Sequence, residues 1–115
     1  MAVNQDLLLV LKSAGLGEGE PDLSEKLLKN FLLMLLESGQ VPARLICMNT
    51  GIFLTTEGTP VREIFENLQR QGTVILSCMT CLDYYHRKDK LVVGQPTNMK
   101  ETVKALLLFP KVLNL

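Results

Sequence analysis

The chain has 115 residues, of which 47% are hydrophobic and 21% charged, a composition that fits a single globular domain over residues 1–115 and excludes disorder as its main state. Twelve Lys and Arg residues balance twelve Asp and Glu residues, so the basic surplus of proteins that bind nucleic acid or anionic membranes is missing. Because a neutral, apolar-rich domain is weakly protected against association, we expect a homo-oligomer with neither nucleic-acid nor membrane partners.

The three cysteines, Cys47, Cys78 and Cys81, do not fit a secreted disulfide framework, because their number is odd. The N-terminal residues lack the charged start and long apolar core of a signal peptide. The longest mostly apolar stretch, Phe31–Leu36, is far shorter than the roughly 20 residues that a membrane span needs. We therefore expect a cytoplasmic protein whose thiols are mainly reduced.

The first half of the chain alternates predicted strands and helices. Asp6–Leu11 is a short continuous apolar run after its first residue, which is typical of a strand buried on both faces. A helix is predicted over Asp22–Ser38, because Gly39 stands at the usual C-terminal position. Ala43–Met48 is predicted to be a second strand, and Asn49–Gly58 to be irregular.

In the second half, capping residues mark two helix starts. Thr59–Pro60 combines an N-cap with a first-turn proline, which predicts a helix that ends at Gly72. Asn98 and Glu101 stand at capping-box spacing, which predicts a last helix over Met99–Leu108. The remaining predicted elements are strands over Thr73–Leu76, Leu91–Val93 and Lys111–Leu115, and a short helical piece over Leu82–Tyr85.

Repeated strand–loop–helix units predict an α/β domain. We expect a three-layer α/β/α sandwich with a mainly parallel sheet of about five strands. The second half of the first helix, Phe31–Leu36, is apolar all round, whereas a helix that lies on a sheet needs an apolar face over only about a third of its circumference. We expect part of this surface to contact another subunit, and complete coverage within the domain is the alternative.

Ligands of open α/β sheets bind at the carboxyl edge, where loops leave the carboxyl ends of the strands. The third such loop contains Cys78 and Cys81, which is the main functional clue in the sequence. The spacing of these cysteines permits a disulfide between them. The four predicted loops at this edge are Ser13–Glu20, Asn49–Gly58, Ser77–Tyr85 and Gly94–Asn98.

A thiol just before a helical turn faces unpaired backbone N–H groups, which favour the nucleophilic thiolate. Cys81 stands closest to the first turn of the predicted piece over Leu82–Tyr85, so we expect it to have the lower pKa of the two rim thiols. The Asp83 carboxylate opposes this effect, because it disfavours a second negative charge nearby.

Other residues carry weaker signals. Cys47, at the end of the second strand, is predicted to be an inert core residue, and simple burial is also the alternative for Cys78 and Cys81. His86 has the chemistry of an acid/base or of a thiolate partner, but a solvated position in a basic turn is favoured. Two cysteines supply half of a zinc site, so no metal or other cofactor is predicted. The loop over 15–19 lacks phosphate-binding spacing and is interpreted as a flexible rim loop.

The segment Ile75–Tyr85, with the sequence ILSCMTCLDYY, resembles the DsrE/DsrF-like superfamily. The closest similarity is to the C-terminal domain of YedF-type proteins, which are described as sulfurtransferase-like and linked to selenium metabolism. Lys88–Leu91, Thr97–Met99 and Leu54–Gly58 support this resemblance, which extends over about Leu7–Leu115.

The resemblance implies a DsrE-like fold that oligomerises, commonly as trimers or hexamers, and carries persulfide or selenium on a rim cysteine. Cys81 and Cys78 would be those thiols. Met79 and His86 stand where glycines are usual. The TusA-like domain of YedF-type proteins is missing from this sequence, so a TusA-like or other persulfide donor protein is expected to act in trans. Further candidate site residues are Asp83, Asn98 and His86.

The leading hypothesis is a cytoplasmic carrier of sulfur or selenium. The Cys81 thiolate would accept a sulfane sulfur, and Cys78 would resolve the persulfide by forming a disulfide. The alternative is a non-catalytic oligomeric module that binds a small ligand or a partner and in which the cysteines are incidental. A third hypothesis is a dithiol redox protein.

Overall fold

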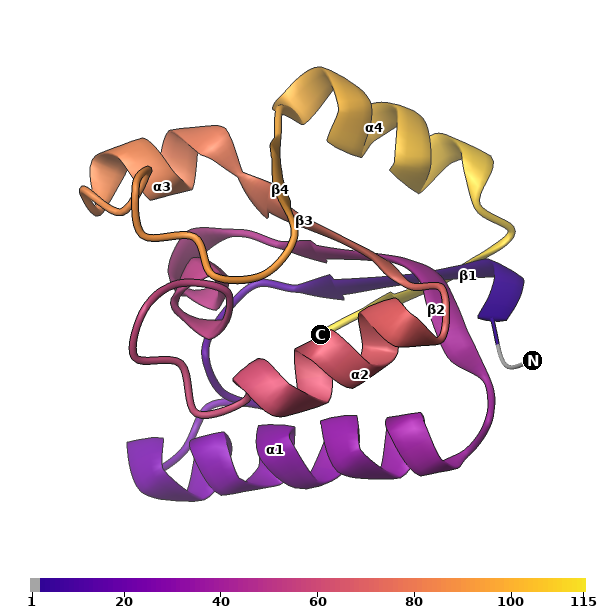
Figure 1. Cartoon of the computed structure of the whole chain (residues 1–115), viewed down its shortest axis with the longest axis horizontal. Coiled ribbons are helices and arrows are strands. Elements are labelled where there is room, and N and C mark those ends of the chain that lie inside the picture. The colour runs from indigo at the N-terminus through magenta and orange to yellow at the C-terminus, as the bar shows by residue number, and fades with distance from the viewer. Residues whose placement is uncertain (1–2) are drawn as a thin grey trace.

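A computed structural model describes residues 3–115 as alternating strands and helices around one sheet (Figure 1). The strands are β1 (Val3–Leu11), β2 (Val41–Cys47), β3 (Val74–Cys78), β4 (Gln95–Thr97) and β5 (Lys111–Asn114). The helices are α1 (Pro21–Glu37), the short 3-10 helix η1 (Asn49–Leu54), α2 (Arg62–Arg70), α3 (Met79–Tyr84) and α4 (Met99–Leu108).

The sheet has the strand order β4-β3-β2-β1-β5, and each of its strand pairings is parallel. In Figure 1, α1 and α2 lie on one side of the sheet, and α3 and α4 lie on the other. Parallel strands need crossover connections, and the helices of those connections cover the two faces. The predicted three-layer α/β/α sandwich with a parallel sheet of about five strands is confirmed.

The alternating side chains of β1 divide the core into two layers. Leu9 and Leu11 belong to the larger buried cluster, which includes residues of α1 and α2. Leu8 and Val10 belong to a smaller cluster that includes Ala105 of α4. Successive residues of a strand point to opposite faces, so a continuous apolar run is what a strand covered on both faces requires.

The strand predicted over Leu91–Val93 is wrong. Leu91 forms only an isolated antiparallel bridge with Thr56, and the backbone N–H groups of Val92 and Val93 donate to the Thr55 carbonyl. These apolar residues pack the loop after α3 against the core. Gly94 then turns the chain at a φ of +77° into β4, so close to Ile75 that a Cβ atom would lie 2.4 Å from its carbonyl oxygen.

Two helix starts also differ from their predictions. Thr59 caps a turn, because its hydroxyl accepts from Val61 N–H at 3.2 Å, and α2 begins only at Arg62. The helix expected to begin at Leu82 begins at Met79 instead. The last helix is confirmed at its predicted bounds, with Asn98 as its N-cap.

The apolar half of α1 is mostly covered by the chain itself. Leu32 is fully buried, and its apolar neighbours, Met34 excepted, are partly buried against the core. Only Met34 of this segment is largely exposed, and a subunit contact at this helix stays a prediction. No helix among residues 3–115 is long and apolar enough to cross a membrane.

Candidate functional site

The two cysteines of the predicted pair meet where β3 passes into α3. Cys78 is the last residue of β3 and the N-cap of α3. Its Sγ accepts a hydrogen bond from the backbone N–H of Cys81 at 3.4 Å. The C-x-x-C spacing brings both thiols to the first turn of one helix, at the carboxyl edge of the sheet.

The two thiols differ in their access to solvent. Cys78 is 8% exposed and counts as buried, whereas Cys81 has intermediate exposure. Cys81 lines a cavity of about 270 Å³ together with Asn49, Thr80, Tyr84 and Tyr85. A reagent or substrate from solution therefore reaches Cys81 more readily than Cys78.

A backbone donor from a distant segment points at the Cys81 sulfur. The N–H of Asn49, the first residue of η1, lies 3.1 Å from Cys81 Sγ. Asn49 has a φ of 52°, in the left-handed region that asparagine tolerates better than most residues. An amide directed at a sulfur stabilises a negative charge on it, so this contact favours the Cys81 thiolate.

The pKa of Cys81 is set by contacts that act in opposite directions. Burial raises the pKa of the Cys81 thiol, and its hydrogen bond to Cys78 raises that pKa further, while the Asn49 N–H lowers it. The cap position of α3, where helix N–H groups favour charge, belongs to the sulfur of Cys78. At neutral pH the Cys81 thiolate is therefore a minority form.

Buried hydroxyls join the end of β3 to the segment that follows η1. Ser77 Oγ and Thr55 Oγ1 share a hydrogen bond of 2.7 Å, and both residues are almost fully buried. Thr55 Oγ1 also donates to the Ile52 carbonyl at 3.1 Å. The position of η1 relative to the thiols is thus fixed from within the core.

The candidate supporting residues lie near the thiols but have other contacts. Asn98 follows Thr97, which pairs with Cys78 in the sheet, and its side chain caps α4 by accepting from Glu101 N–H at 2.8 Å. The Asp83 carboxylate is exposed and lies 4.0 Å from the Lys88 ammonium.

His86 takes a left-handed turn position after α3. Its φ is 57°, its backbone N–H donates to the Asp83 carbonyl, and its side chain is exposed. The histidine does not line the Cys81 cavity. This placement agrees with the favoured interpretation of a solvated turn residue, at a position where the resemblance expects glycine.

Cys47 is a core residue, as predicted. It is fully buried, and burial raises its pKa well above that of an ordinary thiol. Among residues 3–115 there is no group of three or more His, Cys, Asp and Glu side chains placed to hold a metal ion.

Sequence reasoning missed two contributors to the site. Asn49 was assigned only to an irregular loop, and an asparagine directly after a strand is the one local sign of a left-handed turn. Arg87 stands in a charged run, 87–90, with no local sign of a contact, but its Nε donates to Thr56 Oγ1 at 2.8 Å. Two larger cavities at this edge, of about 430 and 410 Å³, are not lined by either thiol.

Comparison with known proteins yields similarity to solved structures. No protein-family model matches the sequence, and no curated protein matches it. The ychN protein from E. coli shares 22% sequence identity and a TM-score of 0.69, over 97% of this chain and 100% of that one.

Two structures described as proteins of unknown function are also similar. MTH1491 from Methanobacterium thermoautotrophicum has a TM-score of 0.72 at 10% identity, covering 97% of this chain and 100% of its own. BT1422 from Bacteroides thetaiotaomicron has a TM-score of 0.66 at 16% identity, covering 96% of this chain and 95% of its own. These similarities confirm the α/β fold that the sequence predicts.

Proposed function

We propose that this chain is a DsrE/DsrF-like protein that carries sulfane sulfur, or selenium, on Cys81. The observation that carries the proposal is the Asn49 N–H at 3.1 Å from the partly exposed Cys81 Sγ. An amide donor on an accessible sulfur stabilises the thiolate that attacks a sulfane donor and leaves on transfer, and a merely structural cysteine needs neither feature.

The transfer is a thiol–persulfide exchange. The Cys81 thiolate attacks the outer sulfur of a donor persulfide R–S–SH, the donor S–S bond breaks, and the donor leaves as the thiolate R–S⁻. Cys81 then carries the outer sulfur as Cys81–S–SH. An acceptor thiolate removes that sulfur by the same exchange and restores the Cys81 thiolate, so no net oxidation or reduction of the carrier occurs.

Cys78 offers a second outcome for the carried sulfur. Its thiolate can attack the inner sulfur of the Cys81 persulfide, which forms a Cys78–Cys81 disulfide and releases hydrosulfide. The carried sulfur is then reduced while the two thiols are oxidised. The N-cap contact between Cys78 Sγ and Cys81 N–H keeps both side chains on one turn, which supports this role.

We propose that the donor is a TusA-like or other persulfide protein that acts in trans in the cytoplasm. The C-M-T-C-L-D segment and the Thr97–Met99 segment favour the YedF-type subgroup. The Cys81 cavity of about 270 Å³ is lined in part by the exposed Tyr84. Aromatic side chains of this kind are enriched where proteins contact one another.

The test is intact-mass spectrometry of the reduced protein after incubation with a sulfane donor. Wild-type protein and the control variant Cys47→Ser are expected to gain one sulfur atom, and Cys81→Ser is expected to gain none. Equal gain by wild type and Cys81→Ser, or no gain by wild type, contradicts the carrier role. A loss of two hydrogens without added sulfur supports the dithiol redox alternative.

We also propose that copies of the chain associate through α4. Met99, Val103 and Leu107 stand four residues apart and are 59%, 44% and 83% exposed, while Thr102 and Ala105 of the same helix are buried. Residues at this spacing form one stripe on a helix.

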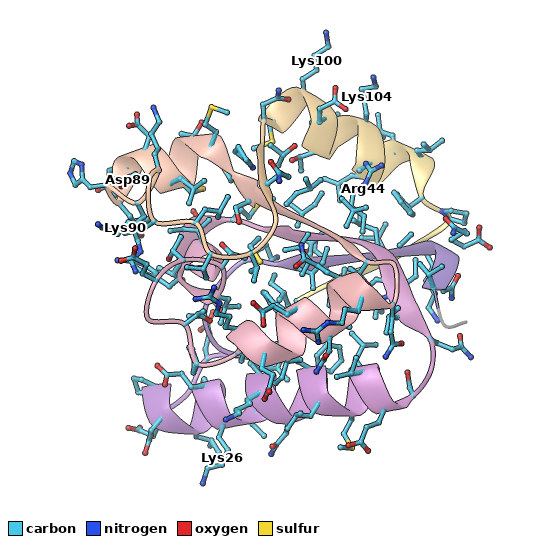
Figure 2. All side chains as sticks on the ribbon, viewed as in Figure 1. Lys26, Arg44, Asp89, Lys90, Lys100 and Lys104 are labelled. Atoms are coloured by element: carbon cyan, nitrogen blue, oxygen red, sulfur yellow. The ribbon has the colours of Figure 1, made fainter. Side chains whose placement is uncertain are left out.

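Charges of both signs border this stripe. The Lys104 ammonium lies 3.8 Å from the Glu101 carboxylate, and Figure 2 shows Lys100 and Lys104 projecting from the side of α4 turned away from the sheet. A neutral chain with such a stripe suits a second copy of itself, because an isologous contact pairs the same patch with itself.

Sedimentation tests this association. Leu107→Glu is expected to reduce the assembly of the wild type to monomer, and Met34→Glu, which places the same charge on the exposed Met34 of α1, is expected to leave it intact. A wild-type monomer at micromolar concentration contradicts the proposal, and so does an assembly that survives Leu107→Glu.

A further inference from the structure

Arg87 stands in a run of charged residues after α3, yet it is anchored at several points. Its Nε donates to Thr56 Oγ1 at 2.8 Å, and its guanidinium group also donates to the Glu57 carbonyl. The same group lies 4.9 Å from the centroid of the Phe53 ring. A planar guanidinium can make these contacts at once, whereas a lysine ammonium cannot.

Arg87 binds Thr56 and Glu57, which directly follow η1, and η1 begins with the residue that contacts the Cys81 sulfur. Within η1 and the residues after it, Thr56 Oγ1 donates to the Ile52 carbonyl at 3.0 Å, and Gly51 N–H donates to the Met48 carbonyl at 2.8 Å. Gly51 also packs so closely on β1 that a Cβ atom there would lie 2.5 Å from the Leu11 carbonyl oxygen. The segment is therefore a short unit with its own internal hydrogen bonds, packed against β1.

Arg87 is tied to α3 as well. Its backbone N–H donates to the carbonyl of Leu82, the residue after Cys81, at 2.7 Å. On the same side, the Tyr85 ring meets the Phe53 ring edge to face with centroids 5.0 Å apart. These contacts connect α3 and η1 at two places. Asn49, at the start of η1, contacts Cys81, and Arg87 contacts both Thr56, after η1, and Leu82 of α3.

We infer that Arg87 is a positioning residue for Cys81, which holds η1 against α3 and so keeps the Asn49 N–H on the Cys81 sulfur. This role rests on the proposed function of Cys81, and it names the residue that keeps the Asn49 N–H in place as hydrogen-bond donor. The Ser77–Thr55 hydrogen bond holds η1 from the sheet side, and the Arg87 contacts hold it on the α3 side, where the Asn49 N–H meets a sulfur 32 positions away in the sequence.

A purely electrostatic effect of Arg87 on the thiolate is the competing explanation. The titratable and charged groups around Cys81 are few. Those of α3 are Asp83 and Tyr84, β3 ends with Cys78, and η1 supplies none. The loop after α3 supplies Tyr85, His86, Arg87, Lys88, Asp89 and Lys90. Arg87 and Lys88 carry the same charge and are adjacent, so Lys88 serves as a matched control.

The experiment measures the rate at which Cys81 is alkylated as a function of pH, with the site read by mass spectrometry. Arg87→Lys and Arg87→Gln are both expected to slow alkylation at pH 7 about tenfold, the scale of one lost hydrogen bond to a charged group. Lys88→Gln is expected to react like wild type. Thermal unfolding checks that each variant is folded. If Arg87→Gln does not fold, Phe53→Leu replaces it and is expected to slow alkylation a few-fold.

Three results overturn the inference. The first is a wild-type alkylation rate in Arg87→Lys, which would assign the effect to charge. The others are unchanged alkylation rates in all Arg87 and Phe53 variants, and a slowing in Lys88→Gln equal to that in the Arg87 variants. Alkylation needs no sulfane donor, so a failure of sulfur uptake in wild-type protein would refute the proposed function while the alkylation rates still decide the role of Arg87.

Discussion

Cys47 and Cys81 are thiols at the carboxyl ends of neighbouring strands, yet their surroundings are opposite. Cys47 ends β2, pairs with Ser77 in the sheet and is fully buried, in one cluster with Ile52 and Leu54 of η1. Cys81 lies in the first turn after β3, lines a cavity and receives the Asn49 N–H. The side chains of η1 thus help to bury Cys47, while its backbone donates a hydrogen bond to Cys81.

The largest expected difference between these thiols is in their labelling rates. Alkylation of Cys47 in the native protein requires the core to open, and such open states have populations of roughly 10⁻³ or lower. Cys81 is expected to react at least about 10³-fold faster than Cys47 when both sites are followed by mass spectrometry. Comparable rates at the two sites would break the comparison.

Replacement by serine is expected to separate the two sites by stability. Cys47→Ser buries a hydroxyl among apolar side chains and should lower the free energy of unfolding by about 1–3 kcal/mol. Cys81→Ser leaves a polar atom at a partly exposed site and should change it by less than about 0.5 kcal/mol. Urea unfolding measures both changes in the free energy of unfolding. An equal loss of stability in the two variants would contradict the claim that Cys47, and not Cys81, is a core residue.

The pH dependence of Cys81 follows from the direction of its pKa shift. Burial and Cys78 raise the pKa of Cys81, so the reactive thiolate is scarce at neutral pH and increases as pH rises. Its alkylation rate should rise about tenfold per pH unit and should still be rising at pH 8.5, about the pKa of an ordinary thiol. A plateau below pH 8 would show a lowered pKa instead.

The smallest effect is expected at Asp83. Its exposed carboxylate lies near Lys88, and solvent screens its influence on the sulfur. Asp83→Asn should change the alkylation rate of Cys81 by less than about twofold. A large acceleration would show that the Asp83 charge, rather than burial, controls this thiol.

Local signals predicted the parts of the fold that local chemistry decides. The capping pair Asn98 and Glu101 gave α4 at its observed bounds, and the apolar run of β1 gave a strand buried on both faces. The three-residue strand β4 contains a proline and has no alternating pattern, whereas Leu91–Val93 looks like a strand and instead packs a loop. Strand character in such short segments is decided by tertiary contacts.

The candidate site was predictable only in part for the same reason. The C-x-x-C motif located Cys78 and Cys81 because both thiols lie on one turn. Asn49 and Arg87 act across 32 and 31 residues of sequence, and such pairings follow from the sheet order and not from spacing. Burial is the main cause of the raised pKa of Cys81, and burial at a helix start is decided by tertiary packing.

The most direct test of the central claim is to locate the added sulfur after the reduced wild-type protein has met a sulfane donor. Trypsin should release Cys47 in the peptide Leu45–Arg62 and both rim cysteines in Gln71–Arg87, and fragmentation between Met79 and Thr80 separates Cys78 from Cys81. We predict that the extra sulfur atom is found on Cys81. Sulfur on Cys47 or on Cys78 alone, or on none of the three, would contradict the account.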